Sequence, residues 1–431
     1  MNVAIVSDRD ADGGANIAAL RITTALADAG HTVTAIYERG GQYPAWTTRL
    51  VPSSLATHTM PFVKRAAVRL IPGTVRLASH QSRSLRHLER ILGEIAPDVV
   101  NVHNLHISDW SPEMIRVAAG FAPVVCTLLD TWTFTGRCVY PGSCRKYIDG
   151  CDDACPTADE YPPLRPSKIA AAWSQRRAIL ADCPNVVAVS PSDWLAETAA
   201  RGIWRERAVF KIPYAIDLRL FTPRDRSNAR RSIGLAPDDR IVLASASDLA
   251  NARKGVRHII EALAEGIGRK VRLLLVGAPI QLEETRGAVV QQLGFIADDS
   301  RRAAIYNCAD LFVHSAREDN APLTVIESLA CGTPVVAFPV DGIPETVIPG
   351  RTGWLADGVG TEPLRLALSR AVADLDSGVD LGATCRAFAE SRYDPADIAA
   401  QYTALFERLR TANGLTRVAS VTGRHDAALS T

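Results

Sequence analysis

The sequence lacks any run of about 18 apolar residues, so no membrane-spanning helix is expected. It also lacks an excess of either charge, because 48 lysines and arginines stand against 47 aspartates and glutamates, for a net charge of +1. A protein that binds nucleic acid through bulk electrostatics carries a larger positive charge, and we exclude that class. The 431 residues are 47% hydrophobic and 22% charged, which predicts buried cores and excludes wholesale disorder.

We expect no secretory signal in the N-terminal residues, because no basic residue opens them and their apolar stretch stops at Asp8. Nine cysteines are present, and five of them are scattered: Cys126, Cys183, Cys308, Cys331 and Cys385. Scattered thiols in a chain without a signal are typical of reduced proteins rather than of a disulfide framework. We therefore expect a cytoplasmic protein.

Short apolar runs alternate with helical patterns along most of the chain. Helical patterns cover residues 16–29, 256–265 and 324–331. The apolar runs, which we predict to be strands, are residues 3–6, 32–37, 98–103, 124–128, 186–189, 241–246, 271–276, 311–314 and 335–338. This alternation predicts an α/β protein with parallel sheets that are covered by helices on both faces.

The number of strand–helix units exceeds what one sheet comfortably holds, so we predict two doubly wound domains, residues 1–213 and 214–389. Residues 213–240, with a charged patch at 224–231, are the expected hinge. Residues 411–431 are polar without an apolar period, which predicts a disordered tail. Ligands of paired α/β domains bind at the carboxyl ends of strands, here in a cleft between the domains.

Residues 315–334 are the richest stretch in candidate functional side chains. A strand ends near His314, and a polar loop leads into a helix that begins around Pro322, whose free N–H groups suit a phosphate. Asp319 and Glu327 flank this turn, and a carboxylate can accept hydrogen bonds from two neighbouring sugar hydroxyls. In the alternative interpretation Asp319 only starts the helix and Glu327 is structural; the residues alone do not decide between the two.

Two further strand-to-helix loops carry candidate residues. Lys254, just before the helix at 256–265, can reach a diphosphate as a point charge, or can be an ordinary solvated lysine. Gly13 and Gly14 allow close approach of backbone to a ligand, but they are not part of a Gly-x-Gly-x-x-Gly fingerprint. The absence of this fingerprint argues against a nicotinamide oxidoreductase, a class that only the α/β pattern supports.

Together these stretches resemble the retaining nucleotide-sugar glycosyltransferases of family 4, of the bacterial polysaccharide-biosynthesis type. Motifs typical of that family are Asp319 to Glu327, residues 330–337, 341–345, 309–313 and 353–355, and Lys254-Gly255; residues 103–106, 135–136 and 190–195 are similar to a bacterial polysaccharide subgroup. The resemblance implies a GT-B fold, in which two Rossmann-like domains face an interdomain cleft. It also implies that a C-terminal helix, residues 390–410, crosses back to the N-terminal domain.

The resemblance implies transfer of a sugar from a UDP-, GDP- or ADP-linked donor to a glycan or lipid-linked acceptor, with retention of configuration. The implied donor contacts are Arg253, Lys254, Asp319, Asn320, Ala321, Leu323 and Glu327, with Glu327 on the ribose and Asp319 on the sugar hydroxyls. The implied acceptor or cleft residues are Gly13, Gly14, His103 and His106. Lys254 and the helix dipole can neutralise the leaving diphosphate, so no catalytic metal is expected.

The chain departs from the family pattern at three positions. Asp319 stands where the family has a glutamate, and Asp248 stands where many relatives have an arginine, which Arg253 can replace. Leu129 stands where the family has a histidine that contacts the transferred sugar, and Asp130 is the next polar candidate there, for an acceptor hydroxyl. The loss of that histidine leaves a second hypothesis open, a catalytically impaired protein that binds nucleotide sugars or glycans.

His103 and His106 lie just beyond a predicted strand end. They contact donor or acceptor in one interpretation, and they are hydrogen-bonded structural histidines in the other.

Cys138, Cys144, Cys151 and Cys155 lie in a glycine-containing loop at residues 136–156. Four thiolates in a compact loop suit a structural zinc ion, which we predict here. Two labile disulfides, or free thiols, are the alternatives.

Residues 62–90 combine seven lysines and arginines with a single acid and interleaved apolar residues. Such a basic amphipathic segment can lie on the inner face of the plasma membrane, where a lipid-linked acceptor is presented. The alternative is a solvated helix face.

Overall fold

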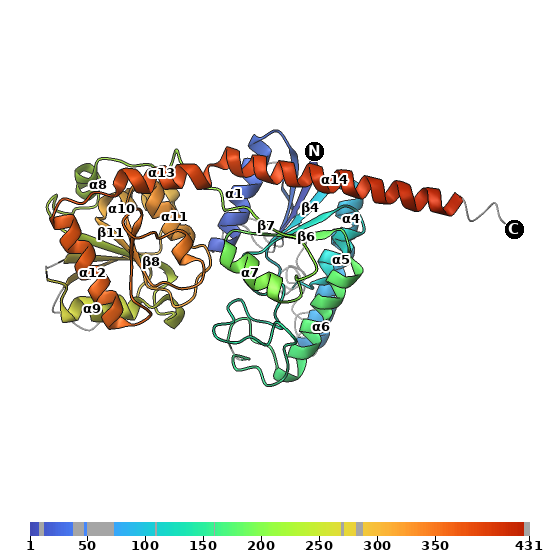
Figure 1. Ribbon diagram of the computed structural model, residues 1–431, viewed down its shortest axis with the longest axis horizontal. Coiled ribbons are helices and arrows are strands. Elements are labelled where there is room, and N and C mark those ends of the chain that lie inside the picture. Colours follow the sequence, from blue (N-terminus) through green and yellow to red (C-terminus); the bar gives the residue numbers. More distant parts are fainter. Residues whose placement is uncertain are drawn as a thin grey trace, which may run out of the picture. The chain divides into compact units, whose positions relative to one another are not determined.

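The computed structural model describes residues 1–7, 13–37, 47–49, 73–107, 110–158, 160–268, 271–281 and 288–425. The chain divides into two compact units (Figure 1). The first unit comprises Met1–Pro191, Leu195–Ile212 and the chain from Ala396 onward; the second comprises Ser192–Trp194 and Pro213–Pro395. Each unit contains one sheet and is described by itself.

The first unit is built on a seven-stranded parallel sheet in the order β3-β2-β1-β4-β5-β6-β7. Its strands are β1 (Asn2–Val6), β2 (Thr32–Tyr37), β3 (Thr47–Arg49), β4 (Val99–Val102), β5 (Val124–Thr127), β6 (Val186–Ser190) and β7 (Val209–Lys211). Continuous apolar runs form the central strands because helices bury them on both faces. The strand order reverses between β1 and β4, and ligands of open α/β sheets bind at the carboxyl side of such a point.

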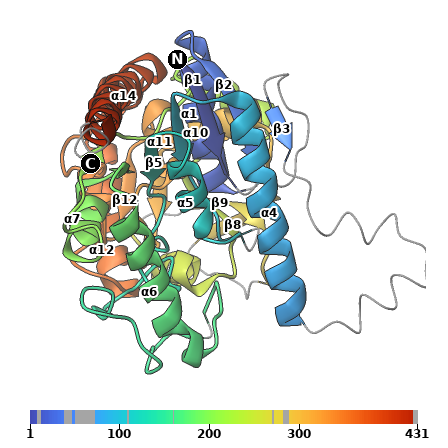
Figure 2. The ribbon, with the colours of Figure 1, turned by 90° about the vertical axis from the view of Figure 1, so that its right-hand side faces the viewer.

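Six helices of the described residues belong to the first unit: α1 (Gly14–Asp28), α4 (Gly73–Ile95), α5 (Glu113–Ala119), α6 (Pro166–Asp182), most of α7 (Asp193–Arg201), and α14 (Pro395–His425). The helix α4 packs against α5 and β1 (Figure 2). Its apolar side chains Leu88, Ile91 and Leu92 are buried, and Arg83 and Arg90 are exposed.

The apolar face of the second half of α4 is thus used inside its own unit, which favours the solvated-face interpretation for residues 80–90. Residues 62–72 lie outside the described residues. Among the helices that the structure describes, none combines the length and the apolar character that crossing a bilayer requires.

The last helix, α14, packs on the first unit. Tyr402 is buried and its hydroxyl lies 3.2 Å from Thr127 Oγ1, while Thr403 Oγ1 lies 2.7 Å from His31 Nε2. We predicted a disordered tail at residues 411–431; this is wrong up to His425, where α14 ends, and residues 426–431 lie outside the described part. A helix that is already formed gains one hydrogen bond for each added residue, and no proline follows Pro395 to stop it.

The second unit is built on a six-stranded parallel sheet in the order β10-β9-β8-β11-β12-β13. Its strands are β8 (Ile241–Asp248), β9 (Val271–Ala278), β10 (Ala288–Gly294), β11 (Leu311–His314), β12 (Val335–Ala337) and β13 (Gly353–Leu355). Its helices are α8 (Arg226–Ser232), α9 (Val256–Glu265), α10 (Asp299–Cys308), α11 (Leu323–Ala330), α12 (Thr361–Asp376) and α13 (Gly382–Tyr393). The predicted α/β class is therefore confirmed in both units.

The charged patch at 224–231 is part of the second unit rather than an open hinge. Arg226 and Arg230, both on α8, lie 3.2 and 2.8 Å from the carboxylate of Asp310, and the backbone N–H of Ile241 donates to Asp310 at 2.7 Å. Arg230 and Asp310 are buried. Asp225 caps the helix by accepting from the N–H of Asn228, and the arginines of the patch neutralise a carboxylate at the amino end of β11, a contact that the sequence does not reveal.

Candidate functional site

The loops that follow β8 and β11 touch each other, and this contact positions Lys254. A short 3-10 turn (Ala252–Lys254) ends at Gly255, which has a φ of +64°. A Cβ atom at Gly255 would lie 2.0 Å from the carbonyl oxygen of Ser315, so glycine is required. The hydroxyl of Ser315 also donates to the carbonyl of Lys254 at 3.0 Å. This approach brings two strand ends, 61 residues apart in sequence, into direct contact.

Lys254 and Asp319 form an ion pair at the carboxyl ends of these strands. Lys254 Nζ lies 2.6 Å from Asp319 Oδ2, and His314 Nε2 lies 3.4 Å from the same oxygen. Burial by itself raises the pKa of Asp319, but the Lys254 ammonium and the His314 hydrogen bond lower that pKa by more, and the net value lies well below the usual one. Asp319 is therefore a buried, ionised group that holds the Lys254 ammonium.

The loop after β12 adds a second carboxylate beside Asp319. The N–H of Asp319 donates to Asp341 Oδ2 at 3.0 Å, and Gly342 lies against Asn320, where an added Cβ atom would come within 2.2 Å of the Asn320 carbonyl oxygen. Burial, Glu318 and Asp319 together raise the pKa of Asp341 to about 7. In the sequence Asp341 stands out only as part of a family motif, and its raised pKa follows from contacts that the sequence does not reveal.

Because Asp341 is protonated more readily in the folded chain than at its ordinary pKa of 3.8, its contribution to stability is full below about pH 4 and is lost as the pH rises through about 7. Asp341→Asn, which removes the charge, is expected to raise the free energy of unfolding by about 2 kcal/mol at pH 8 and by almost nothing at pH 4. Asparagine tolerates the φ of +48° at this position. Urea unfolding at the two pH values measures the difference; an equal effect at both contradicts it.

Helix α11 begins next to this pair. Pro322 is its N-cap, with extended backbone angles, and no side chain caps the N–H groups that follow at Leu323. The Asn320 side-chain oxygen accepts a hydrogen bond from the Ser192 hydroxyl. The structure therefore brings Lys254, Asp319 and the amino end of α11 together, as we expected for residues that bind a phosphorylated donor.

Glu327 lies in the middle of α11 and contacts two side chains of α10. Arg302 Nη2 lies 3.2 Å from Glu327 Oε1, and the Tyr306 hydroxyl donates to Glu327 Oε2 at 3.2 Å. Glu327 is only 2% exposed. This favours the structural interpretation of Glu327, and its predicted contact with a ribose stays a prediction.

The predicted cleft residues of the first unit lie at the switch point of its sheet. Gly13, with a φ of +96°, precedes α1; among the described residues, and apart from chain neighbours and the helix's own backbone, no atom lies within 4 Å of where a Cβ of Gly13 or Gly14 would be. His103 follows β4, and its backbone N–H donates to the Val6 carbonyl at 2.8 Å. Burial lowers the pKa of His103 to about 3, so its ring is neutral at physiological pH.

His106 and Asp130 lie together beyond the ends of the neighbouring strands β4 and β5. His106 Nε2 is 3.0 Å from Asp130 Oδ2, and His106 Nδ1 is 3.3 Å from the hydroxyl of Tyr161. Sequence reasoning singled out His106 and Asp130 but missed Tyr161, which lies 55 residues further along the chain than His106.

The four cysteines of the loop at 136–156 are all present as thiols. Cys138 Sγ and Cys155 Sγ lie 3.6 and 3.8 Å from Thr157 Oγ1, and Cys151 Sγ accepts from the N–H of Gly136 at 3.2 Å. Within the described ranges, no three histidine, cysteine or acidic side chains are placed to hold a metal ion. The four thiols nevertheless lie near one another, because Cys138, Cys144 and Cys155 add to burial in raising the pKa of Cys151.

Binding of structural zinc by these four thiols stays a prediction. Metal analysis of the purified chain checks it, with one zinc atom per chain as the expected result. A metal-free chain whose unfolding temperature does not respond to a chelator contradicts it.

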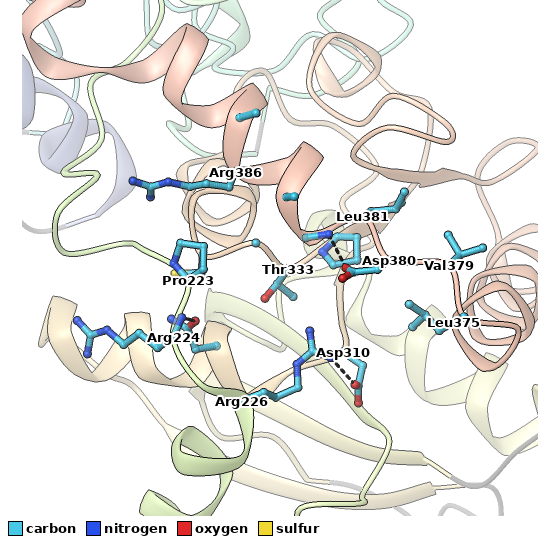
Figure 3. A pocket seen from close by; sticks show the side chains of 18 of the residues that line it. Pro223, Arg224, Arg226, Asp310, Thr333, Leu375, Val379, Asp380, Leu381 and Arg386 are labelled. Carbon is cyan, nitrogen blue, oxygen red and sulfur yellow. Dashed lines mark hydrogen bonds and ion pairs between the residues drawn. The ribbon is translucent and has the colours of Figure 1, made fainter.

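A pocket of about 810 Å³ opens in the second unit, at the amino-terminal ends of the strands of its sheet (Figure 3). It is lined by residues that precede strands, such as Asp310 before β11 and Pro334 before β12, and by the start of α13. Figure 3 shows that Arg226 points to Asp310, so these charges neutralise each other. Lys254 and Asp319 lie at the opposite, carboxyl edge, and we do not assign this pocket to them.

Two family models match the chain in succession. Residues 12–220 match Glycosyltransferase Family 4, and residues 240–374 match Glycosyl transferases group 1. The D-inositol 3-phosphate glycosyltransferase of Actinosynnema mirum is 36% identical over 180 residues, which cover 38% of this chain and 43% of that protein. The putative colanic acid biosynthesis glycosyl transferase WcaC of Escherichia coli is 28% identical over 264 residues, or 58% of this chain and 62% of that protein. The chain thus spans less than half the length of the D-inositol 3-phosphate glycosyltransferases that it matches.

Two solved structures share the fold over 95% of this chain. Sucrose-phosphate synthase from Thermosynechococcus elongatus has a TM-score of 0.70 at 21% identity, with 99% of that chain covered. Anabaena Alr3699/HepE, solved in complex with UDP and glucose, has a TM-score of 0.63 at 16% identity, with 100% covered. The predicted GT-B fold is therefore confirmed.

Proposed function

We propose that this chain, which belongs to the family 4 glycosyltransferases, moves a sugar from a nucleotide-diphosphate donor to a glycan or lipid-linked acceptor with retention of configuration. The observation that carries the proposal is the Lys254–Asp319 ion pair, 2.6 Å long, at the carboxyl edge of the second sheet and next to the uncapped start of α11. A cation and free backbone N–H groups at one strand edge suit a diphosphate.

The chemistry that these groups supply is stabilisation of the leaving diphosphate. Breaking the bond between sugar and phosphate places negative charge on the phosphate oxygens, and a cation already in place stabilises that charge without reorganisation. Asp319 fixes the Lys254 ammonium, while Lys254 remains 22% exposed and thus reachable by a ligand. In this proposal Asp319 acts on the donor through Lys254 as well as on the sugar hydroxyls.

A thermal-shift screen with UDP-, GDP- and ADP-sugars tests this proposal and identifies the donor. A ligand that binds only the folded chain raises its unfolding temperature, and we expect the largest shift from a UDP-sugar, because the similar Anabaena structure is a complex with UDP and glucose. Lys254→Ala should abolish most of that shift. A chain that responds to none of the three donor classes contradicts the proposed function.

Leu129 favours a second candidate function, a binding protein with impaired transfer. Under that proposal a donor raises the unfolding temperature, yet no product forms with any acceptor tested. Leu129→His then raises turnover only if the missing imidazole limits it.

A further inference from the structure

Three polar side chains of the first unit form a chain of hydrogen bonds that ends on an exposed ring. Asp130 and His106 are 15% and 6% exposed in their side chains, and their contact is 3.0 Å long. His106 in turn lies 3.3 Å from the hydroxyl of Tyr161, which is 56% exposed. A largely covered carboxylate is thereby connected, through one imidazole, to a hydroxyl at the surface.

The direction of these hydrogen bonds follows from the chemistry of the groups. The Asp130 carboxylate can only accept, so His106 Nε2 carries the proton and donates it. In the neutral ring Nδ1 then accepts, and the Tyr161 hydroxyl donates its one proton to it. With this arrangement of protons, the Tyr161 oxygen is left to accept a hydrogen bond from a ligand, and the connected hydrogen bonds strengthen one another.

Neighbouring residues hold these three hydrogen-bonded side chains in place. Arg137, which is buried, donates to the carbonyl oxygens of Tyr161 and Pro162 at 3.1 and 2.9 Å. Asp130 Oδ1 accepts from the N–H of Trp132 at 2.8 Å, and the Trp132 ring lies 5.6 Å from the His106 ring. Tyr161 is therefore exposed but fixed, as a preorganised binding residue must be.

We propose that Tyr161 contacts the acceptor saccharide, with its ring against an apolar sugar face and its oxygen accepting from a sugar hydroxyl. His106 and Asp130 are positioning residues that act through Tyr161. The group lies beyond the carboxyl ends of β4 and β5, the edge at which α/β sheets bind ligands, and it joins an aromatic surface to fixed polar atoms, as saccharide sites require. The assignment of the saccharide as acceptor rests on the proposed function.

Saturation-transfer NMR on the full chain tests this contact, with methyl α-D-glucoside, methyl α-D-galactoside and methyl α-D-mannoside as probes. We expect at least one probe to bind, and Tyr161→Phe to weaken it about three- to tenfold, because one hydrogen bond is lost while the ring stays. Tyr161→Ala should weaken it further. Tyr140→Phe, on the same loop region and also part-exposed, is the matched control and should bind as the unchanged chain does.

Two results overturn the proposal: no probe binds the unchanged chain, or Tyr161→Phe and Tyr161→Ala bind like the control. The tautomer of His106 is a separate check on the direction of these hydrogen bonds. We expect ¹⁵N-histidine spectra to show the ring protonated at Nε2 and not at Nδ1. The opposite tautomer contradicts the hydrogen-bond direction on which the role of Tyr161 depends.

The same variants separate this proposal from the proposed function. Tyr161→Phe should leave the UDP-sugar thermal shift unchanged, since the residue is assigned to the acceptor. If the unchanged chain shows no donor shift but binds a methyl glycoside through Tyr161, the saccharide contact stands and the transferase function fails. If the donor shift is present and Tyr161→Phe changes no probe affinity, only the saccharide contact fails.

Discussion

Lys254→Ala is expected to lower kcat for sugar transfer by about 100- to 1000-fold, the range seen when one preorganised group that stabilises developing charge is removed. The reason is that Lys254 is the cation nearest to Asp319 at the strand edge and is held there before the donor arrives. Because the charge on the leaving diphosphate is greatest in the transition state, kcat should fall more than the donor KM rises. Initial rates over a range of donor concentrations measure both quantities.

Lys254→Ala also leaves Asp319 buried without its 2.6 Å partner, so its unfolding temperature has to be measured alongside the rates. Lys254→Arg keeps the positive charge and should recover part of the activity. Arg257→Ala is the matched control, because Arg257 is a cation three residues further on whose side chain is 90% exposed. A Lys254→Ala chain that folds and transfers sugar within threefold of the unchanged rate contradicts the role of Lys254.

The central strands could be predicted because they are continuous apolar runs. Residues 32–37 and 311–314 coincide with β2 and β11, and the helix predicted at 256–265 coincides with α9. The strands that were missed, among them β3, β10 and β13, are short or lie toward sheet edges, where one face need not be apolar. In β10, for example, Gln291 and Gln292 stand where a buried strand would have apolar residues.

The contact between Lys254 and Asp319 could also be expected, because both follow the ends of strands that adjoin in a parallel sheet. Asp341 and Tyr161 could not be foreseen as site residues. Asp341 is distinguished by its contact with Asp319, 22 positions away, and Tyr161 by its contact with His106, 55 positions away. Glu327 was identified from its spacing, but spacing within α11 says nothing of α10, which occupies both of its oxygens.

Glu327→Ala is expected to lower the free energy of unfolding by about 3 kcal/mol, because it leaves the largely buried Arg302 guanidinium and the Tyr306 hydroxyl without their shared carboxylate. Asp299→Ala is the matched control, since Asp299 contacts the same arginine at 2.7 Å but is 37% exposed. It should cost less than 1 kcal/mol. Urea unfolding of both variants measures the difference, and equal losses contradict the assignment of Glu327 to a buried network.

The affinity for UDP then separates a structural Glu327 from one that also holds a ribose. Glu327→Gln keeps the side-chain shape, so its Kd for UDP can be measured by calorimetry well below the unfolding temperature. A ribose held by the carboxylate predicts a Kd about tenfold higher, because a hydrogen bond to a charged acceptor is replaced by one to a neutral amide. An unchanged Kd together with lowered stability confines Glu327 to the contact between α10 and α11, and the donor contacts then come from Lys254 and the start of α11.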